Sequence, residues 1–172
     1  NMGLFGFLKK AGKKDEAVEK SPSIEQGGFE KAFTEVQKDM ISTCLEYVED
    51  KADKVYIYVC NEEHEICCDF FFEIAGKVYS THKLPEGYDT DADRHFSCLD
   101  MLNHAVLKLR DLCKKYDTDA PSEMKIIYDA VNHKVDAKYR YGNVLGEDEM
   151  PEDVAEKWFN EISRSDLTAL DH

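Results

Sequence analysis

The chain has 172 residues, of which 42% are hydrophobic and 34% are charged, and its formal net charge at pH 7 is −14. This length suits one domain with a sizeable core, and no stretch approaches the roughly 18 consecutive apolar residues that a membrane-spanning helix needs. An acidic body repels nucleic acid and anionic membranes, so the charge disfavours both as partners and favours a protein with a basic surface. Solubility alone is the alternative explanation of the charge.

The first 28 residues differ in composition from the rest of the chain. Met2–Lys14 has apolar residues followed by four lysines, a pattern typical of a short amphipathic segment that makes weak contact with a membrane surface. A loose tail, or one docked on its own domain, is the alternative. Residues 15–28 contain Ser-Pro-Ser and Gly-Gly and predict a linker. We therefore expect an N-terminal segment over 1–28, a single domain over 29–164 and a C-terminal tail over 165–172.

Apolar residues recur at steps of three and four in three segments, which predicts three helices. The first two are expected at Phe29–Asp50 and at Asp93–Tyr116. The last is expected to begin at Pro151 and to bury a side that includes Trp158.

Alternating apolar residues predict five strands, and Glu65–Ile74 (EICCDFFFEI) is the most informative of them. Its even-numbered residues are all apolar, which indicates a core-facing side of a central strand, whereas its odd-numbered residues mix carboxylates with Phe71 and Cys67. The element order α-β-β-β-α-β-β-α predicts an α+β fold, an antiparallel sheet of about five strands with helices packed mainly on one face. The other strands are expected at Lys54–Asn61, Val78–Lys83, Glu123–Ala130 and Lys134–Tyr141.

Six cysteines occupy apolar positions of these predicted helices and strands, which indicates buried free thiols of a reducing cytosol and a cytoplasmic protein. Cys60, His64, Cys67 and Cys68 lie within nine residues, a density that raises the question of zinc. Adjacent residues of a strand point to opposite faces, so Cys67 and Cys68 cannot converge on one ion. No metal site and no cofactor are expected.

Asp89, Asp91 and Asp93 alternate as at the start of a calcium-binding loop. Arg94 stands where such a loop needs glycine, and a strand and a helix flank the segment instead of two helices. A helix N-cap with acidic residues in the first turn is the simpler interpretation.

Sequence motifs of catalysis are missing. There is no G-x-S-x-G, no H-E-x-x-H and no glycine-rich phosphate loop. We therefore expect a protein that is not an enzyme. An active site assembled only by the fold is the remaining alternative.

The second face of the predicted sheet is the candidate binding surface. Aromatic side chains interleaved with carboxylates suit an interface, since rings give contact area and acids steer a basic partner. A helix folded over this face as well is the alternative, because strands that are apolar on both sides are often buried on both sides. The candidate residues are Tyr56, Tyr58, Asp69, Phe71, Glu73, Tyr79, Ile127 and Asp129, together with Asp89, Asp91 and Asp93 of the adjoining loop.

Four short motifs accompany the leading amphipathic helix: KVYIY at Lys54–Tyr58, DFFF at Asp69–Phe72, KLRDL at Lys108–Leu112 and KYRYG at Lys138–Gly142. Together they resemble the YezG-like immunity proteins of Gram-positive bacteria, over about residues 29–162. The resemblance implies an antitoxin that binds and neutralises a secreted toxin, expected to be a nuclease. A membrane-surface adaptor working through Met2–Lys14 is the alternative from another class of protein.

Overall fold

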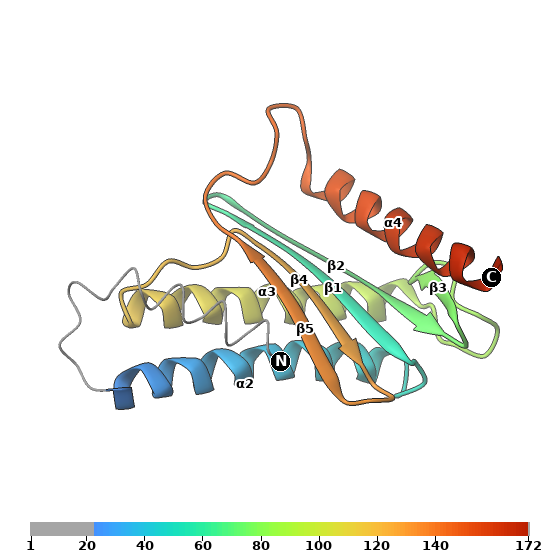
Figure 1. Ribbon diagram of the computed structural model, residues 1–172, viewed down its shortest axis with the longest axis horizontal. Coiled ribbons are helices and arrows are strands. Elements are labelled where there is room, and N and C mark those ends of the chain that lie inside the picture. Colours follow the sequence, from blue (N-terminus) through green and yellow to red (C-terminus); the bar gives the residue numbers. More distant parts are fainter. Residues whose placement is uncertain (1–22, 172) are drawn as a thin grey trace.

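The computed structural model describes the backbone of residues 23–171 and the side chains of residues 27–165, and within these it has three helices and one five-stranded sheet (Figure 1). The predicted α+β class and element order are confirmed. In this described part, no helix combines the length and the apolarity needed to cross a membrane. The elements are α2 (Ser23–Tyr47), β1 (Lys54–Glu62), β2 (Glu65–Ile74), β3 (Lys77–Ser80), α3 (Ala92–Lys115), β4 (Glu123–Asp129), β5 (Lys134–Arg140) and α4 (Pro151–Asp171).

The sheet has the order β3-β2-β1-β4-β5, and every neighbouring pair is antiparallel (Figure 1). Strands β1 and β2 form a hairpin whose pairing runs without interruption from Lys54↔Glu73 to Glu62↔Glu65. The bounds predicted for Glu65–Ile74 are confirmed, but this strand lies next to the centre, and β1 is the central one.

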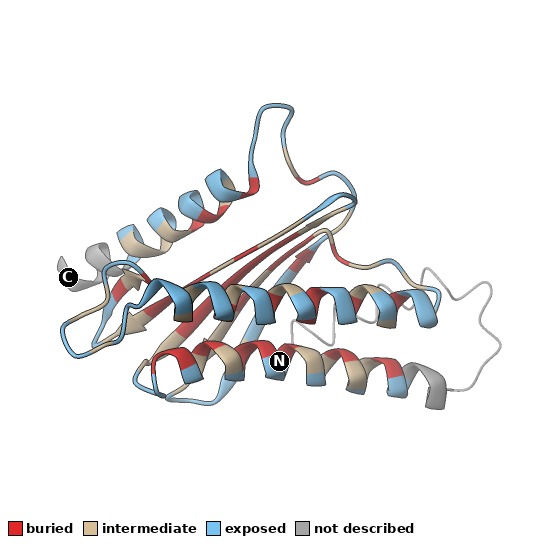
Figure 2. Ribbon diagram, turned by 180° about the vertical axis from the view of Figure 1, so that it is seen from behind, coloured by how far each residue is buried: buried red, intermediate tan, exposed pale blue. Residues whose placement is uncertain are grey.

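Helices α2 and α3 cover the first face of the sheet, with their buried residues turned toward the strands (Figure 2). The predicted core-facing side of β2 is confirmed, because Phe70 and Phe72 lie in this cluster together with Val55, Ile57 and Val59 of β1. Tyr47 of α2 fixes the contact, with its ring edge-on to Phe70 at 5.2 Å and stacked on Phe72 at 6.2 Å.

Helix α4 crosses the second face over β2 and β3 (Figure 1). Its buried side carries Ala155 and Trp158, which pack with Tyr56, Tyr58 and Phe71. Two of the three described helices therefore lie on one face, as predicted, while the third closes part of the other.

Two segments predicted as irregular are helical. The predicted linker is helix from Ser23 onward, and most of the predicted C-terminal tail continues α4 to Asp171. A Cβ at Gly28 would lie 3.2 Å from the hydroxyl of Tyr116, the C-cap residue of α3, so the close approach favours glycine here in spite of its low helix propensity. The segment Met2–Lys14 and the first part of the predicted linker lie outside the described residues.

Smaller differences concern where elements end. Helix α2 ends at Tyr47 instead of Asp50, because Glu49 and Asp50 adopt positive φ angles of 53° and 61° that a helix cannot continue. Strand β3 ends at Ser80, where the carbonyl accepts a turn hydrogen bond from the Lys83 amide.

Candidate functional site

The aromatic part of the predicted binding face is buried under α4. Tyr56, Tyr58 and Phe71 are 3%, 0% and 3% exposed. Tyr56 stacks on Phe71 with a ring separation of 4.7 Å, and the Trp158 ring lies edge-on to both, at 5.8 and 5.2 Å. The expectation of an open face at these three positions is therefore corrected: they hold α4 in place, and no partner reaches them while α4 is seated.

Asp129 and Ile127 lie on β4 and both are half-buried, with Ile127 packed against the cluster under α4. The Asp129 carboxylate accepts hydrogen bonds from the amides of Val131 and Asn132 and from the Asn132 side chain. These bonds, first of all the one from the Asn132 side chain, lower the Asp129 pKa. The Asp129 carboxylate thus stabilises the turn between β4 and β5, which accounts for an acidic residue at this position.

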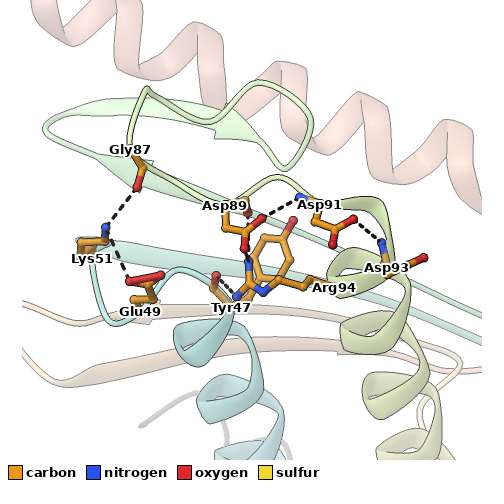
Figure 3. A network of polar contacts seen from close by, with 8 residues as sticks. All are labelled: Tyr47, Glu49, Lys51, Gly87, Asp89, Asp91, Asp93 and Arg94. Atoms are coloured by element: carbon orange, nitrogen blue, oxygen red, sulfur yellow. Dashed lines mark hydrogen bonds and ion pairs between the residues drawn. The ribbon is translucent and has the colours of Figure 1, made fainter.

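Asp89, Asp91 and Asp93 belong to the cap and first turn of α3 (Figure 3). Asp91 accepts a hydrogen bond from the Asp93 amide, and Asp89 accepts one from the Asp91 amide, so the predicted N-cap is confirmed. Arg94 packs on the Tyr47 ring at 4.8 Å, donates to the Tyr47 carbonyl and forms an ion pair of 3.7 Å with Asp89. All three carboxylates remain exposed, so the cap also presents an acidic surface.

Three of the predicted residues, Asp69, Phe71 and Tyr79, come together in a groove of about 570 Å³ between β3 and α4. We call this the β3–α4 groove. Its apolar lining comes from Phe71 and Phe159, whose rings are edge-on at 5.0 Å, and Phe70, whose side chain lies in the core on the other face, is also among the lining residues. Its other lining residues are Lys77, Val78, Ser80, Thr81, His82, Lys83, Glu156 and Asn160. Glu73, also predicted, is half-buried further along β2 and does not line the groove.

Asp69 is the most unusual residue of the β3–α4 groove. Its carboxylate accepts a hydrogen bond of 2.8 Å from the Phe70 amide, and no lysine or arginine among the described residues forms an ion pair with it. Burial raises the Asp69 pKa, which the Phe70 amide and the nearby His82 offset only in part. The carboxylate therefore costs folding free energy, as a group kept for binding often does.

The same groove contains Ser80 and His82, residue types found in nucleophilic active sites. In the described part of the chain, however, no hydrogen bond joins Ser80 to His82 or His82 to Asp69. A serine hydroxyl needs an adjacent base to act as a nucleophile, so these residues do not form a catalytic unit in this arrangement.

The cysteines are free thiols, and five of the six are buried, as predicted. Cys67 and Cys68 lie on opposite faces of β2, and Cys60 is the cross-strand neighbour of Cys67. Burial raises the pKa of the Cys60 thiol to about 11 and that of the Cys67 thiol to about 12, so both stay protonated at neutral pH. Among residues 27–165, no three His, Cys, Asp or Glu side chains are placed to hold a metal ion.

A second acidic surface was not among the predicted site residues. It comprises the six carboxylates of residues 147–156, which we call the acidic run: Glu147, Asp148, Glu149, Glu152, Asp153 and Glu156. All six are exposed, and no basic side chain among the described residues forms an ion pair with them. The signal was present in the sequence, since six of ten consecutive residues are acidic and none is basic.

Two carboxylates of the acidic run fix its backbone. Glu149 accepts a hydrogen bond from the Gly146 amide, and Asp153 accepts one from the Met150 amide at the start of α4. In each case a backbone bond runs the opposite way, so one side-chain and one backbone hydrogen bond join the same two residues. The loop before α4 therefore presents its acids from a defined conformation.

The candidate site is thus a groove with a partly buried carboxylate, accompanied by two acidic surfaces. Its chemistry suits recognition of positive charge. Comparison of the chain with protein-family models and with curated proteins found no match.

Proposed function

We propose that this protein is a non-enzymatic immunity protein that binds and neutralises a protein toxin with a basic surface. The observation that carries the proposal is the acidic run, six exposed carboxylates within ten residues that no described base pairs with. The sequence resemblance to YezG-like immunity proteins supports the same function and makes a nuclease the expected toxin.

The physical argument is electrostatic. A nuclease binds phosphates in a basic cleft, and an acidic surface of fixed shape competes for that cleft. Glu149 and Asp153 hold the loop, while the neighbouring Glu147 and Asp148 make no side-chain hydrogen bond to any described residue and are exposed to a partner. A preformed loop loses less conformational entropy on binding, which favours tight association.

Binding to the toxin encoded by the adjacent gene tests the proposal directly. We expect the purified protein to bind that toxin and to suppress its activity, with an association rate that falls as salt is added. The absence of a toxin-like neighbour, together with no neutralisation, would contradict the function.

A charge-reversal pair tests the surface. Glu147→Lys with Asp148→Lys leaves the two capping carboxylates in place, and we expect it to slow association about tenfold or more at low salt. Asp100→Lys with Asp111→Lys on the exposed side of α3 makes the same change of net charge and serves as the control. Equal slowing by both variants would show that net charge alone, and not the acidic run, guides the partner.

A further inference from the structure

We propose that the β3–α4 groove binds an extended, basic segment of a protein partner, which lies along β3 and places a lysine or arginine side chain against Asp69. This inference rests on the proposed function for the basic character of the partner. It adds the place and the manner of binding, and the site that it names shares only Glu156 with the acidic run.

The open edge of the sheet at β3 is the first observation. β3 pairs with β2 on one side and ends the sheet on the other. Apart from the turn bond between Lys83 and Ser80, the described residues make no hydrogen bond to Lys77–Ser80 from outside the sheet. An edge strand with free backbone groups is a template on which an extended segment adds as a further strand.

Asp69 is the second observation. Asp69 lies on β2, two residues beyond the Phe71↔Ser80 pair at which the β2–β3 pairing ends. A segment that lies along β3 and continues past Ser80 therefore passes close to its carboxylate. The carboxylate accepts one backbone hydrogen bond, and no described lysine or arginine forms an ion pair with it. A guanidinium or ammonium group would supply that charge, and the pair would be strong because water is partly excluded from the groove.

The walls of the groove are the third observation. Phe159 is half-buried and lines the groove with ring surface, held edge-on against the buried Phe71. The hydrocarbon stem of a lysine or arginine packs against such a ring, and its cation is attracted to it. Glu156, an exposed member of the acidic run, lines the same groove from α4 and adds a second negative charge.

Two lysines of the groove repel a basic ligand, so removing one of them should change affinity in the opposite direction to removing the Asp69 charge. Lys77 and Lys83 are exposed, and the Lys77 ammonium lies 5.4 Å from the Tyr79 ring centre. Long exposed side chains move aside at low cost, but their positive charge weakens the attraction between Asp69 and a cation of the ligand. Removal of Lys77 should therefore tighten binding, whereas removal of the Asp69 charge should weaken it.

The experiment is an NMR titration of the full chain, labelled with nitrogen-15, with the capped hexapeptide acetyl-VRVRVT-amide. We expect saturable shifts confined to the amides of residues 69–71, 77–83 and 156–160. A matched peptide with citrulline in place of arginine keeps the shape without the charge and should bind about tenfold more weakly. Shifts elsewhere, no shifts, or equal affinity for the two peptides would overturn the inference.

Three variants complete the test. Asp69→Asn should lower peptide affinity about tenfold and Lys77→Ala should raise it a few-fold, while Asp100→Asn on the exposed side of α3 should leave it unchanged. An unchanged affinity of Asp69→Asn, with its folded spectrum intact, contradicts the role of Asp69. A wild-type protein that neutralises its toxin but ignores the peptide disproves this site and leaves the proposed function standing, whereas failure to bind any toxin disproves the proposed function itself.

Discussion

The two faces of the sheet are built differently. Among the described residues, 23 buried apolar residues form the cluster under α2 and α3, whereas seven form the cluster under α4. Buried polar groups differ as well: Gln37 on the first face is neutral, and Glu123 on the second is a carboxylate held by the Tyr58 hydroxyl and Arg140. The first face has the size and composition of a folding core.

The second face combines a small core with the charged features that suit binding. The β3–α4 groove lies beside α4, and the acidic run leads into this helix. A region with fewer buried apolar residues contributes less to stability and opens more readily than the main core. We infer that the first face supplies stability, which allows the second face to carry groups such as Asp69 that cost stability.

Removal of a large side chain from the first face should have the largest effect. Phe72 is fully buried and contacts Tyr47 and Phe70, so Phe72→Ala should lower the free energy of unfolding by about 3–5 kcal/mol. Urea unfolding followed by circular dichroism measures this loss. A loss below about 1 kcal/mol would contradict the assignment of the first face as the main core.

The corresponding change on the second face should cost less and act locally. Trp158→Ala removes the α4 ring that touches Tyr56, Tyr58 and Phe71, with an expected loss of about 3 kcal/mol, the lower end of the range for such changes. Hydrogen exchange should accelerate in α4 and remain slow in α2 and α3. Equal acceleration in all three helices would mean that the two faces unfold as one unit.

The fold was predictable because two periodicities define it. Alternation in Glu65–Ile74 assigned Phe70 and Phe72 to the core side, and steps of three and four located the helices. The position of α4 was not predictable, because its apolar stripe shows that one side is buried without showing against which face. The sequence pattern at Tyr56 and Tyr58 was therefore compatible with an aromatic face open to solvent and with one covered by a helix.

The candidate site was predictable only in part. Asp69 and Tyr79 stood out by alternation, and Asp91 by its place before a helix. The β3–α4 groove was missed because β3 and α4 lie more than 70 residues apart, and Thr81 or Asn160 alone carries no sequence signal. Gly28 was assigned to a linker because its contact with Tyr116 is visible only in three dimensions.

The buried polar groups of the two faces should respond differently to removal of a hydrogen bond. Tyr58→Phe leaves the buried Glu123 carboxylate without its hydroxyl donor and should cost about 1–3 kcal/mol. Gln37→Met on the first face removes an amide whose nitrogen donates to the Tyr139 hydroxyl and whose oxygen has no hydrogen-bond partner among the described residues. The lost hydrogen bond and the removal of the unpaired oxygen have opposite effects, so stability should change by less than about 1 kcal/mol. Thermal unfolding of both variants compares them, and a larger loss for Gln37→Met would reverse the contrast.

The smallest expected change is a gain in stability, from Asp69→Asn. Burial raises the Asp69 pKa above its ordinary 3.8, so the folded protein binds this proton more tightly than the unfolded chain does. Stability is therefore lost as the pH rises from 3.8 through the raised pKa. Asparagine has no such proton and still accepts the bond from the Phe70 amide, so the variant should be more stable than the wild type at pH 7.

Measuring unfolding from pH 3 to pH 7 isolates this contribution, because the advantage of Asp69→Asn should disappear below pH 3.8, where both states of the wild type are protonated. Asp93→Asn, at an exposed position of the α3 cap, is the control and should show no such pH-dependent gain. A variant less stable than the wild type at pH 7 would mean that the Asp69 charge is compensated within the fold. The carboxylate would then need no partner, and the proposal that the β3–α4 groove binds a basic side chain would lose its second observation.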